Sequence, residues 1–211
     1  MNLILIPLLL IPALPQSPEA DGNFPQLEPA MDAWQVNHGE EWQVRWDRNT
    51  GYAEILFGFN AAAPFEPTED NDWFGLTRVW AAEASPLLGV QPSELVNLEV
   101  NFLPFGMANG TDKMTVQLGQ EIGGVPVERA FVNGLFSAQG RLLSLANTTL
   151  PGLSGLSVAP SIDADAAEAR ALRFFRAETR LIATSVSEPE LLFARLEEDG
   201  RAYGQLAWRV Q

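Results

Sequence analysis

The sequence predicts an α+β protein: an N-terminal β-hairpin followed by two small modules, each with a helix packed on an antiparallel β-sheet. Three observations support this prediction. Residues 114–146 have the pattern of three consecutive strands, residues 73–89 form an amphipathic helix ahead of them, and residues 161–211 repeat the order of a helix and then a hairpin. Because a sheet with one apolar face needs a second layer to cover it, we expect each helix to lie across its own strands.

The first strand of the central stretch, residues 114–122, shows the alternation of a strand with one buried face. The residues expected to be buried are Met114, Val116, Leu118, Gln120 and Ile122. Gly123-Gly124 ends this strand, and Pro126 lacks a backbone donor, so a tight bend or a sheet edge is expected there. Residues 127–137 form the second strand. Gln139-Gly140 suits a hairpin turn before the third strand at 141–146.

This stretch resembles the FTP domain, which is found in the propeptides of fungalysin- and thermolysin-type zinc metallopeptidases. The family pattern is roughly Q-x-x-x-G-[IV]-P-V, then a strand, then x-x-G-x-[VL]-x-S. The matching residues here are Gln120, Gly124, Pro126, Val127 and Gly140. The resemblance implies an FTP-like, cystatin-like module over residues 61–150. Within it we expect Gly124 and Pro126 to set the corner and Gly140 to set the hairpin. Gln120 is expected to satisfy backbone groups at the bend.

The helix expected at 73–89 places apolar residues at helical spacing. Its stripe comprises Leu76, Val79, Trp80, Glu83 and Leu87. We expect Asp72 to cap the helix, Gly89 to close it, and Pro86 to mark a kink or the last turn. Residues 94–101 read as one more strand. The irregular loop at 102–112 is longer than the usual link in the FTP family, and its role is not assigned.

After a Gly/Ser/Pro-rich linker at 151–160, residues 161–211 predict a helix capped by Ser161 or Asp163. The apolar face of this helix is expected to contain Ala167, Ala171, Leu172 and Phe175. Strands at 190–196 and 205–210 flank a turn at 197–200. The ending L-A-W-R-V, which contains Trp208, resembles the PepSY domain that follows FTP in these precursors. The resemblance implies a PepSY-like module over 161–211, and a truncation at its C-terminal end stays open.

The N-terminal part divides into three. Residues 1–20 begin with an apolar run at 1–11 that is too short to span a bilayer and fits a secretory signal peptide. No Lys or Arg precedes this run. Residues 21–33 are Pro-rich and are expected to form an extended linker, with order resuming at Trp34. Residues 34–60 contain a hairpin with turn chemistry at 47–51, and this W-x-V-R-W-D-x-x-T-G segment is similar to one that often precedes the FTP domain.

The formal net charge is −14, and there is no cysteine. Repulsion from phosphate makes nucleic acids and anionic membranes poor partners, so neither is expected for the mature form. The single histidine, His38, is expected to be a solvated loop residue. With no other histidine and no cysteine, the usual zinc ligands cannot be assembled, and H-E-x-x-H is absent. Paired carboxylates fall in predicted turns. Asn109-Gly110-Thr111 and Asn147-Thr148-Thr149 match the glycosylation acceptor, a short motif that often arises by chance. We therefore expect no catalytic residues, no metal and no cofactor.

The FTP-PepSY resemblance implies a non-catalytic propeptide of a secreted metallopeptidase that acts as intramolecular chaperone and inhibitor. Its partner would be its own or a cognate metallopeptidase catalytic domain, in the extracellular space or cell envelope. The chain stops directly after a strand, so we interpret it as the precursor part of a longer gene product. Two alternatives stay open: a free-standing secreted peptidase inhibitor or protein-binding module, and a cell-surface interaction protein.

Overall fold

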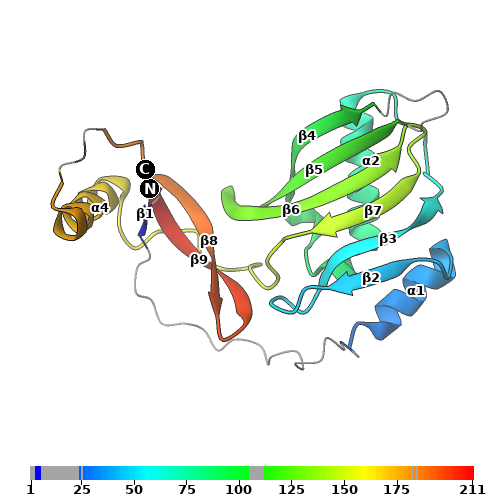
Figure 1. Cartoon of the computed structure of the whole chain (residues 1–211), viewed down its shortest axis with the longest axis horizontal. Helices are drawn as coiled ribbons and strands as arrows, with labels where there is room; N and C mark the ends of the chain where they lie inside the picture. The colour runs from blue at the N-terminus through cyan, green and yellow to red at the C-terminus, as the bar shows by residue number, and fades with distance from the viewer. Residues whose placement is uncertain (1–2, 6–23, 25, 105–111, 182, 184) are drawn as a thin grey trace.

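The computed structural model describes residues 3–5, 24, 26–104, 112–181, 183 and 185–211. The predicted α+β class is confirmed, with mostly antiparallel strands (Figure 1). The elements follow in the order β1 (Leu3–Leu5), α1 (Glu28–His38), β2 (Gln43–Trp46), β3 (Ala53–Ala61), α2 (Asp70–Glu83), α3 (Ser85–Leu88), a 3₁₀ turn (Pro92–Glu94), β4 (Leu95–Leu103), β5 (Lys113–Ile122), β6 (Val125–Ser137), β7 (Leu142–Asn147), α4 (Ala164–Thr179), β8 (Glu190–Glu198) and β9 (Arg201–Val210).

Strand β6 belongs to two groups of strands. In the main sheet the order is β4-β5-β6-β7-β3-β2, and every neighbouring pair is antiparallel. The β8–β9 hairpin joins at the start of β6, where Val127 lies beside Phe193 in a parallel pair. Strand β1 pairs with β9. The N-terminal hairpin, β2–β3, is therefore part of the main sheet, since β3 pairs with β7.

The bend after β5 is a two-residue hairpin turn. Gly123 and Gly124 have φ values of 57° and 85°, and Ile122 lies directly opposite Val125. Positive φ at both central residues is the backbone that matches the twist of the flanking strands, and glycine adopts it without steric cost. The predicted tight bend is thus confirmed. The predicted buried face of β5 is also confirmed, with Met114 only partly buried at its start.

Helix α2 covers one face of the main sheet, as predicted (Figure 1). Leu76 and Trp80 are buried beneath it, and the Trp73 ring lies 5.7 Å from that of Phe136 on β6. Val79, which we expected in the apolar stripe, is 44% exposed. The helix ends before Pro86, which lies in the first turn of the short α3, and Gly89 closes α3 with a φ of 70°.

The cap of α2 differs from the prediction by one turn. The helix begins at Asp70 with Glu69 as N-cap, so Asp72 lies in the first turn. The Asp72 carboxylate accepts hydrogen bonds from the Thr68 amide (2.9 Å), the Thr68 hydroxyl (2.8 Å) and the Glu69 amide (3.3 Å). These bonds from Thr68 and Glu69 lower the pKa of Asp72 from its ordinary value of 3.8, because they stabilise the ionised carboxylate.

Helix α1 corrects two predictions. We expected an extended linker up to residue 33, but α1 begins at Glu28, with Pro29 in its first turn where the missing amide costs nothing. We expected His38 to be a solvated loop residue, but it is in the last turn of α1 and its side chain is 12% exposed. Its Nε2 atom lies 2.8 Å from Glu83 Oε1, and its ring packs 4.3 Å from that of Trp34. Glu83 is far away in sequence, so this partner could not be seen in advance.

In the C-terminal module, the β8–β9 hairpin packs against α4 and against the main sheet. Asp163 caps α4 as predicted, by accepting a hydrogen bond from the Ala166 amide at 2.8 Å. We expected β9 to start at residue 205, but it starts at Arg201. Both sides of this strand pack against other residues: Ala207 and Val210 are buried, and Leu206 and Trp208 are half-buried. Leu206 packs against the apolar cluster that contains Val127, whereas Ala207 belongs to a separate buried cluster.

We predict that Asp72→Ala lowers the thermal unfolding midpoint by a few degrees at pH 7. Because the folded-state pKa is lowered, the contribution of Asp72 is complete above pH 3.8 and is lost as the pH falls through that lowered pKa. The difference from the wild type should therefore shrink at acid pH. Circular-dichroism melts between pH 7 and pH 3 measure this. Asp70→Ala, in the same turn, is the control, and an equal effect of the two changes would contradict the assignment.

Candidate docking surface and module junction

The main sheet has one face that no described helix covers, opposite α2 (Figure 1). Strand register shows which side chains lie there, because neighbours across strands point to the same side and alternate with buried residues. Val116, Val132 and Leu145 point into the core under α2. The residues between them therefore point to the uncovered side.

We call this uncovered side the open face. In the order of the strands from β5 to β3, its residues are Thr115, Gln117, Gly119, Phe131, Asn133, Leu135, Ser144, Ala146, Ile55 and Phe57. Leu98 of β4 lies over Gly119, where an added Cβ would come within 2.8 Å of it. Phe57 is 40% exposed and Leu98 is 50% exposed. These positions are apolar or neutral polar, and charged residues lie at the borders of the open face: Lys113 at the start of β5, Glu99 of β4 opposite Gln117, and Arg45 of β2 opposite Ile55.

A second feature is the junction where the C-terminal hairpin meets the main sheet. Its apolar centre combines Val127 and Ala130 of β6 with Phe193 of β8 and with Leu150 and Leu153 of the linker. Gly204 of β9 lets the strand approach this linker closely, since an added Cβ would lie 2.9 Å from Leu153. The predicted Gly/Ser/Pro spacer is therefore packed at its start, with both leucines buried.

Gln120 fixes the linker to the sheet. Its side chain is 2% exposed, donates to the Leu150 carbonyl at 2.8 Å and accepts from the Leu150 amide at 2.8 Å. It also donates to Glu94 at 3.0 Å. We expected Gln120 to satisfy backbone groups at the nearby bend, but its partner is Leu150, which lies 30 positions away in the segment after β7. Only tertiary structure could reveal this pairing.

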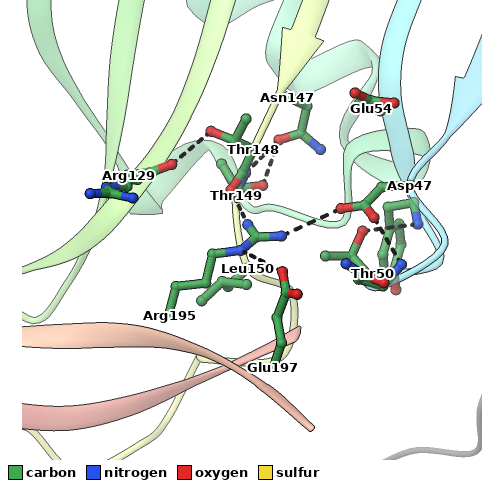
Figure 2. A network of polar contacts seen from close by, with 12 residues as sticks. Asp47, Thr50, Glu54, Arg129, Asn147, Thr148, Thr149, Leu150, Arg195 and Glu197 are labelled. Carbon is green, nitrogen blue, oxygen red and sulfur yellow. Dashed lines mark hydrogen bonds and ion pairs between the residues drawn. The ribbon is translucent and has the colours of Figure 1, made fainter. Parts of the chain in front are cut away.

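A polar network borders the junction on the side of the N-terminal hairpin (Figure 2). Arg195 of β8 donates to the Thr148 carbonyl at 3.0 Å and lies 3.6 Å from Asp47 and 3.8 Å from Glu197. The Ala202 amide donates to the Asn49 carbonyl at 2.9 Å. These groups line an open cleft of about 660 Å³. Since Arg195 already contacts protein acceptors, we interpret the network as a link between the modules.

The structure separates the residues of the family resemblance. Gln120 and Val127 lie at the junction, and Gly124 and the exposed Pro126 form the adjacent turn region. Gly140 lies elsewhere, with a φ of 79°, in a turn against Pro67 and Leu76. Trp208 lies in the C-terminal module, where its indole donates to the Ile162 carbonyl at 3.0 Å.

Asn147 is a structural residue in this fold. Its amide donates to the Ala53 carbonyl at 2.9 Å and to the Leu88 carbonyl at 3.0 Å, and the residue is 5% exposed. The acceptor motif at 147–149 is therefore closed to a glycan in the folded chain. The second such motif, at 109–111, and most of the long loop fall outside the described residues.

Among the described residues, no group of three or more His, Asp or Glu is placed to hold a metal ion. None of the described helices is long and apolar enough to cross a membrane. No protein-family model matches the chain, no curated protein matches it, and no solved structure matches it.

We predict that Gln120→Leu destabilises the chain by about 3 kcal/mol, because it leaves the buried amide and carbonyl of Leu150 without partners. Gln117→Leu on the open face of the same strand should change stability by less than about 0.5 kcal/mol. Urea unfolding followed by tryptophan fluorescence measures both. Equal effects would show that the contact with Leu150 has no special weight.

The two motif glycines provide a second test. Gly124→Ala should cost about 1 kcal/mol, since it only forces alanine into the left-handed region with no atom within 4 Å of the new Cβ. Gly140→Ala should cost at least twice as much, because its Cβ would also lie 2.7 Å from Pro67. Denaturant unfolding compares them, and a smaller loss at Gly140 would contradict the role of close packing.

Proposed function

We propose that this chain is the non-catalytic propeptide region of a secreted fungalysin- or thermolysin-like zinc metallopeptidase. In this role it binds its own or a cognate catalytic domain, assists the folding of that domain and inhibits it. The open face is the surface on which the catalytic domain docks. The proposal combines the FTP-PepSY resemblance of residues 61–211 with the chemistry of this face.

The observation that supports docking most strongly is the absence of charge at the centre of the open face. The chain contains 27 acidic and 13 basic residues, yet the ten central positions on β3, β5, β6 and β7 carry none. The charged residues Lys113, Glu99 and Arg45 lie at the borders of the face. The centres of protein–protein interfaces are depleted of charged residues and enriched in aromatic ones. Phe57, Phe131 and Leu98 supply apolar side chains that a partner can cover.

Docking accounts for both parts of the proposed role. A peptidase that unfolds very slowly gains longevity but can face a high barrier to folding. A preformed sheet that binds the native arrangement of the catalytic domain stabilises that arrangement as it forms. The barrier to folding of the catalytic domain is thereby lowered. When the two parts belong to one polypeptide, the tether raises the effective concentration of the inhibitor, so modest contacts suffice until the tether is cut.

We predict that the purified chain inhibits thermolysin-like or fungalysin-like enzymes with slow, tight kinetics. The double change Phe57→Glu with Leu98→Glu should weaken the inhibition constant at least tenfold, because it places charges in the apolar interface. Peptide-hydrolysis progress curves measure this.

The matched control is Phe65→Glu, since Phe65 is also 40% exposed but lies outside the open face. Inhibition that depends on Phe65 and not on the open face would reject this docking surface. No inhibition and no help in refolding denatured catalytic domains of either class would reject the propeptide function. A reading frame that continues past Gln211 into H-E-x-x-H would favour a tethered propeptide over a free-standing inhibitor.

A further inference from the structure

The positive charge of this acidic chain is concentrated on one side of one helix. Four of the 13 basic residues lie between positions 170 and 180, together with a single acid, Glu178. They are Arg170, Arg173, Arg176 and Arg180, spaced three or four residues apart, which places them on one side of α4 and its C-cap. All four are exposed. We call this side of α4 the arginine face.

The arginine face is not occupied by ion pairs within the described part of the chain. No carboxylate there lies within 4 Å of these four guanidinium groups, and Arg173 donates only to the Ala169 carbonyl of its own helix. Positive charges near a helix C-terminus interact favourably with the helix dipole, and this interaction accounts for Arg176 and Arg180. It does not account for Arg170 and Arg173, which lie earlier in the helix.

Two large apolar side chains accompany the arginines. Phe174 is 52% exposed and lies one turn after Arg170, between the arginine face and the buried row of Ala167 and Ala171. Leu181 is 62% exposed and follows the C-cap Arg180, just beyond the end of the helix. Through Ala167 and Ala171, α4 packs against β9 and β1. Cations next to exposed aromatic and aliphatic groups are typical of helices that lie on a membrane surface.

The position of α4 in the molecule supports the same occupant. Figure 1 shows α4 at one end of the long axis, with the main sheet toward the other end. At physiological ionic strength charges are screened over about 8 Å, so distant carboxylates do little to repel a surface that α4 contacts. Strand β1, the described part of the apolar run at 1–11, also lies beside α4. Leu3–Leu5 and the arginine face thus lie at the same end of the described structure.

We propose that the arginine face of α4 docks on an anionic phospholipid bilayer, with the guanidinium groups at the lipid phosphates and with Phe174 and Leu181 at the headgroup boundary. From the negative net charge we expected no anionic membrane as a partner. The local positive charge of the arginine face changes this expectation, because charges farther away than the screening length contribute little to the contact. The inference goes beyond the proposed function and does not depend on it. Membrane contact would hold the chain at the cell envelope while its open face points elsewhere.

The test is co-sedimentation of the full chain with vesicles of equal parts phosphatidylglycerol and phosphatidylcholine, against vesicles of phosphatidylcholine alone. We expect binding to the anionic vesicles that high salt abolishes. A basic residue near an anionic surface contributes about fivefold in affinity, so Arg170→Glu with Arg173→Glu should weaken binding at least tenfold. Phe174→Ser should weaken it less and leave its salt dependence unchanged.

The matched control is Arg45→Glu with Arg48→Glu, two exposed residues of the N-terminal hairpin, which changes the net charge by the same amount. It should bind within about threefold of the wild type, because screening removes distant charges from the contact. Far-UV circular dichroism verifies that α4 stays folded in each variant.

Three results would overturn the proposal. Equal losses in the two double variants would show that only net charge matters. Equal binding to neutral and anionic vesicles, unaffected by the arginine changes, would assign binding to the apolar N-terminal run, which every variant keeps. Binding of polyglutamate but not of vesicles, with the same dependence on Arg170 and Arg173, would assign the face to an acidic polypeptide.

Discussion

The arrangement of the whole chain depends on how β6 accommodates more residues than its neighbour β5. Gly119 lies opposite Phe131 and Glu121 lies opposite Pro126, so residues 127–130 of β6 face Gln120 alone. Arg129 absorbs part of this excess with a φ of 54°. The bulge turns the start of β6 toward β8 and leaves room for the Gln120 side chain to reach Leu150. One local irregularity thereby lets a single strand serve both modules.

Side-chain hydrogen bonds compensate for the backbone groups that the bulge leaves unpaired. An irregular strand exposes backbone groups that the sheet no longer pairs, and burial of such groups is costly. Here Thr148 supplies side-chain partners: its hydroxyl donates to the Arg129 carbonyl and accepts from the Phe131 amide. Arg195 then binds the carbonyl of Thr148 from the C-terminal hairpin. Hydrogen bonds that repair the main sheet therefore also hold the second module in place.

The surfaces of the molecule differ in kind because charge is distributed unevenly over the fold. The centre of the open face is uncharged, while the arginine face carries cations at the end of the long axis. Apolar and neutral side chains favour a protein partner that excludes water, whereas separated guanidinium groups favour a surface of negative charge. Since the two surfaces belong to different modules, the proposed peptidase and bilayer do not compete for the same residues.

The sequence by itself determined the local structure of this protein. Alternation in β5, the glycine pair at 123–124 and the cap at Asp163 are short-range signals, because each depends on neighbours a few residues away. The sequence was misleading where one residue type allows two structures. Proline was expected to prevent a helix at 21–33, but Pro29 lies in the first turn of α1, where proline is favourable. Tertiary structure alone decided the long-range partners, namely Gln120 with Leu150, His38 with Glu83 and Asn147 with Ala53. The physical reason is that a buried polar group must find a partner somewhere, but the residue type does not say which strand or linker will bring that partner near. The uncharged centre of the open face was likewise hidden in the sequence, since its residues come from four strands that only the strand register brings together.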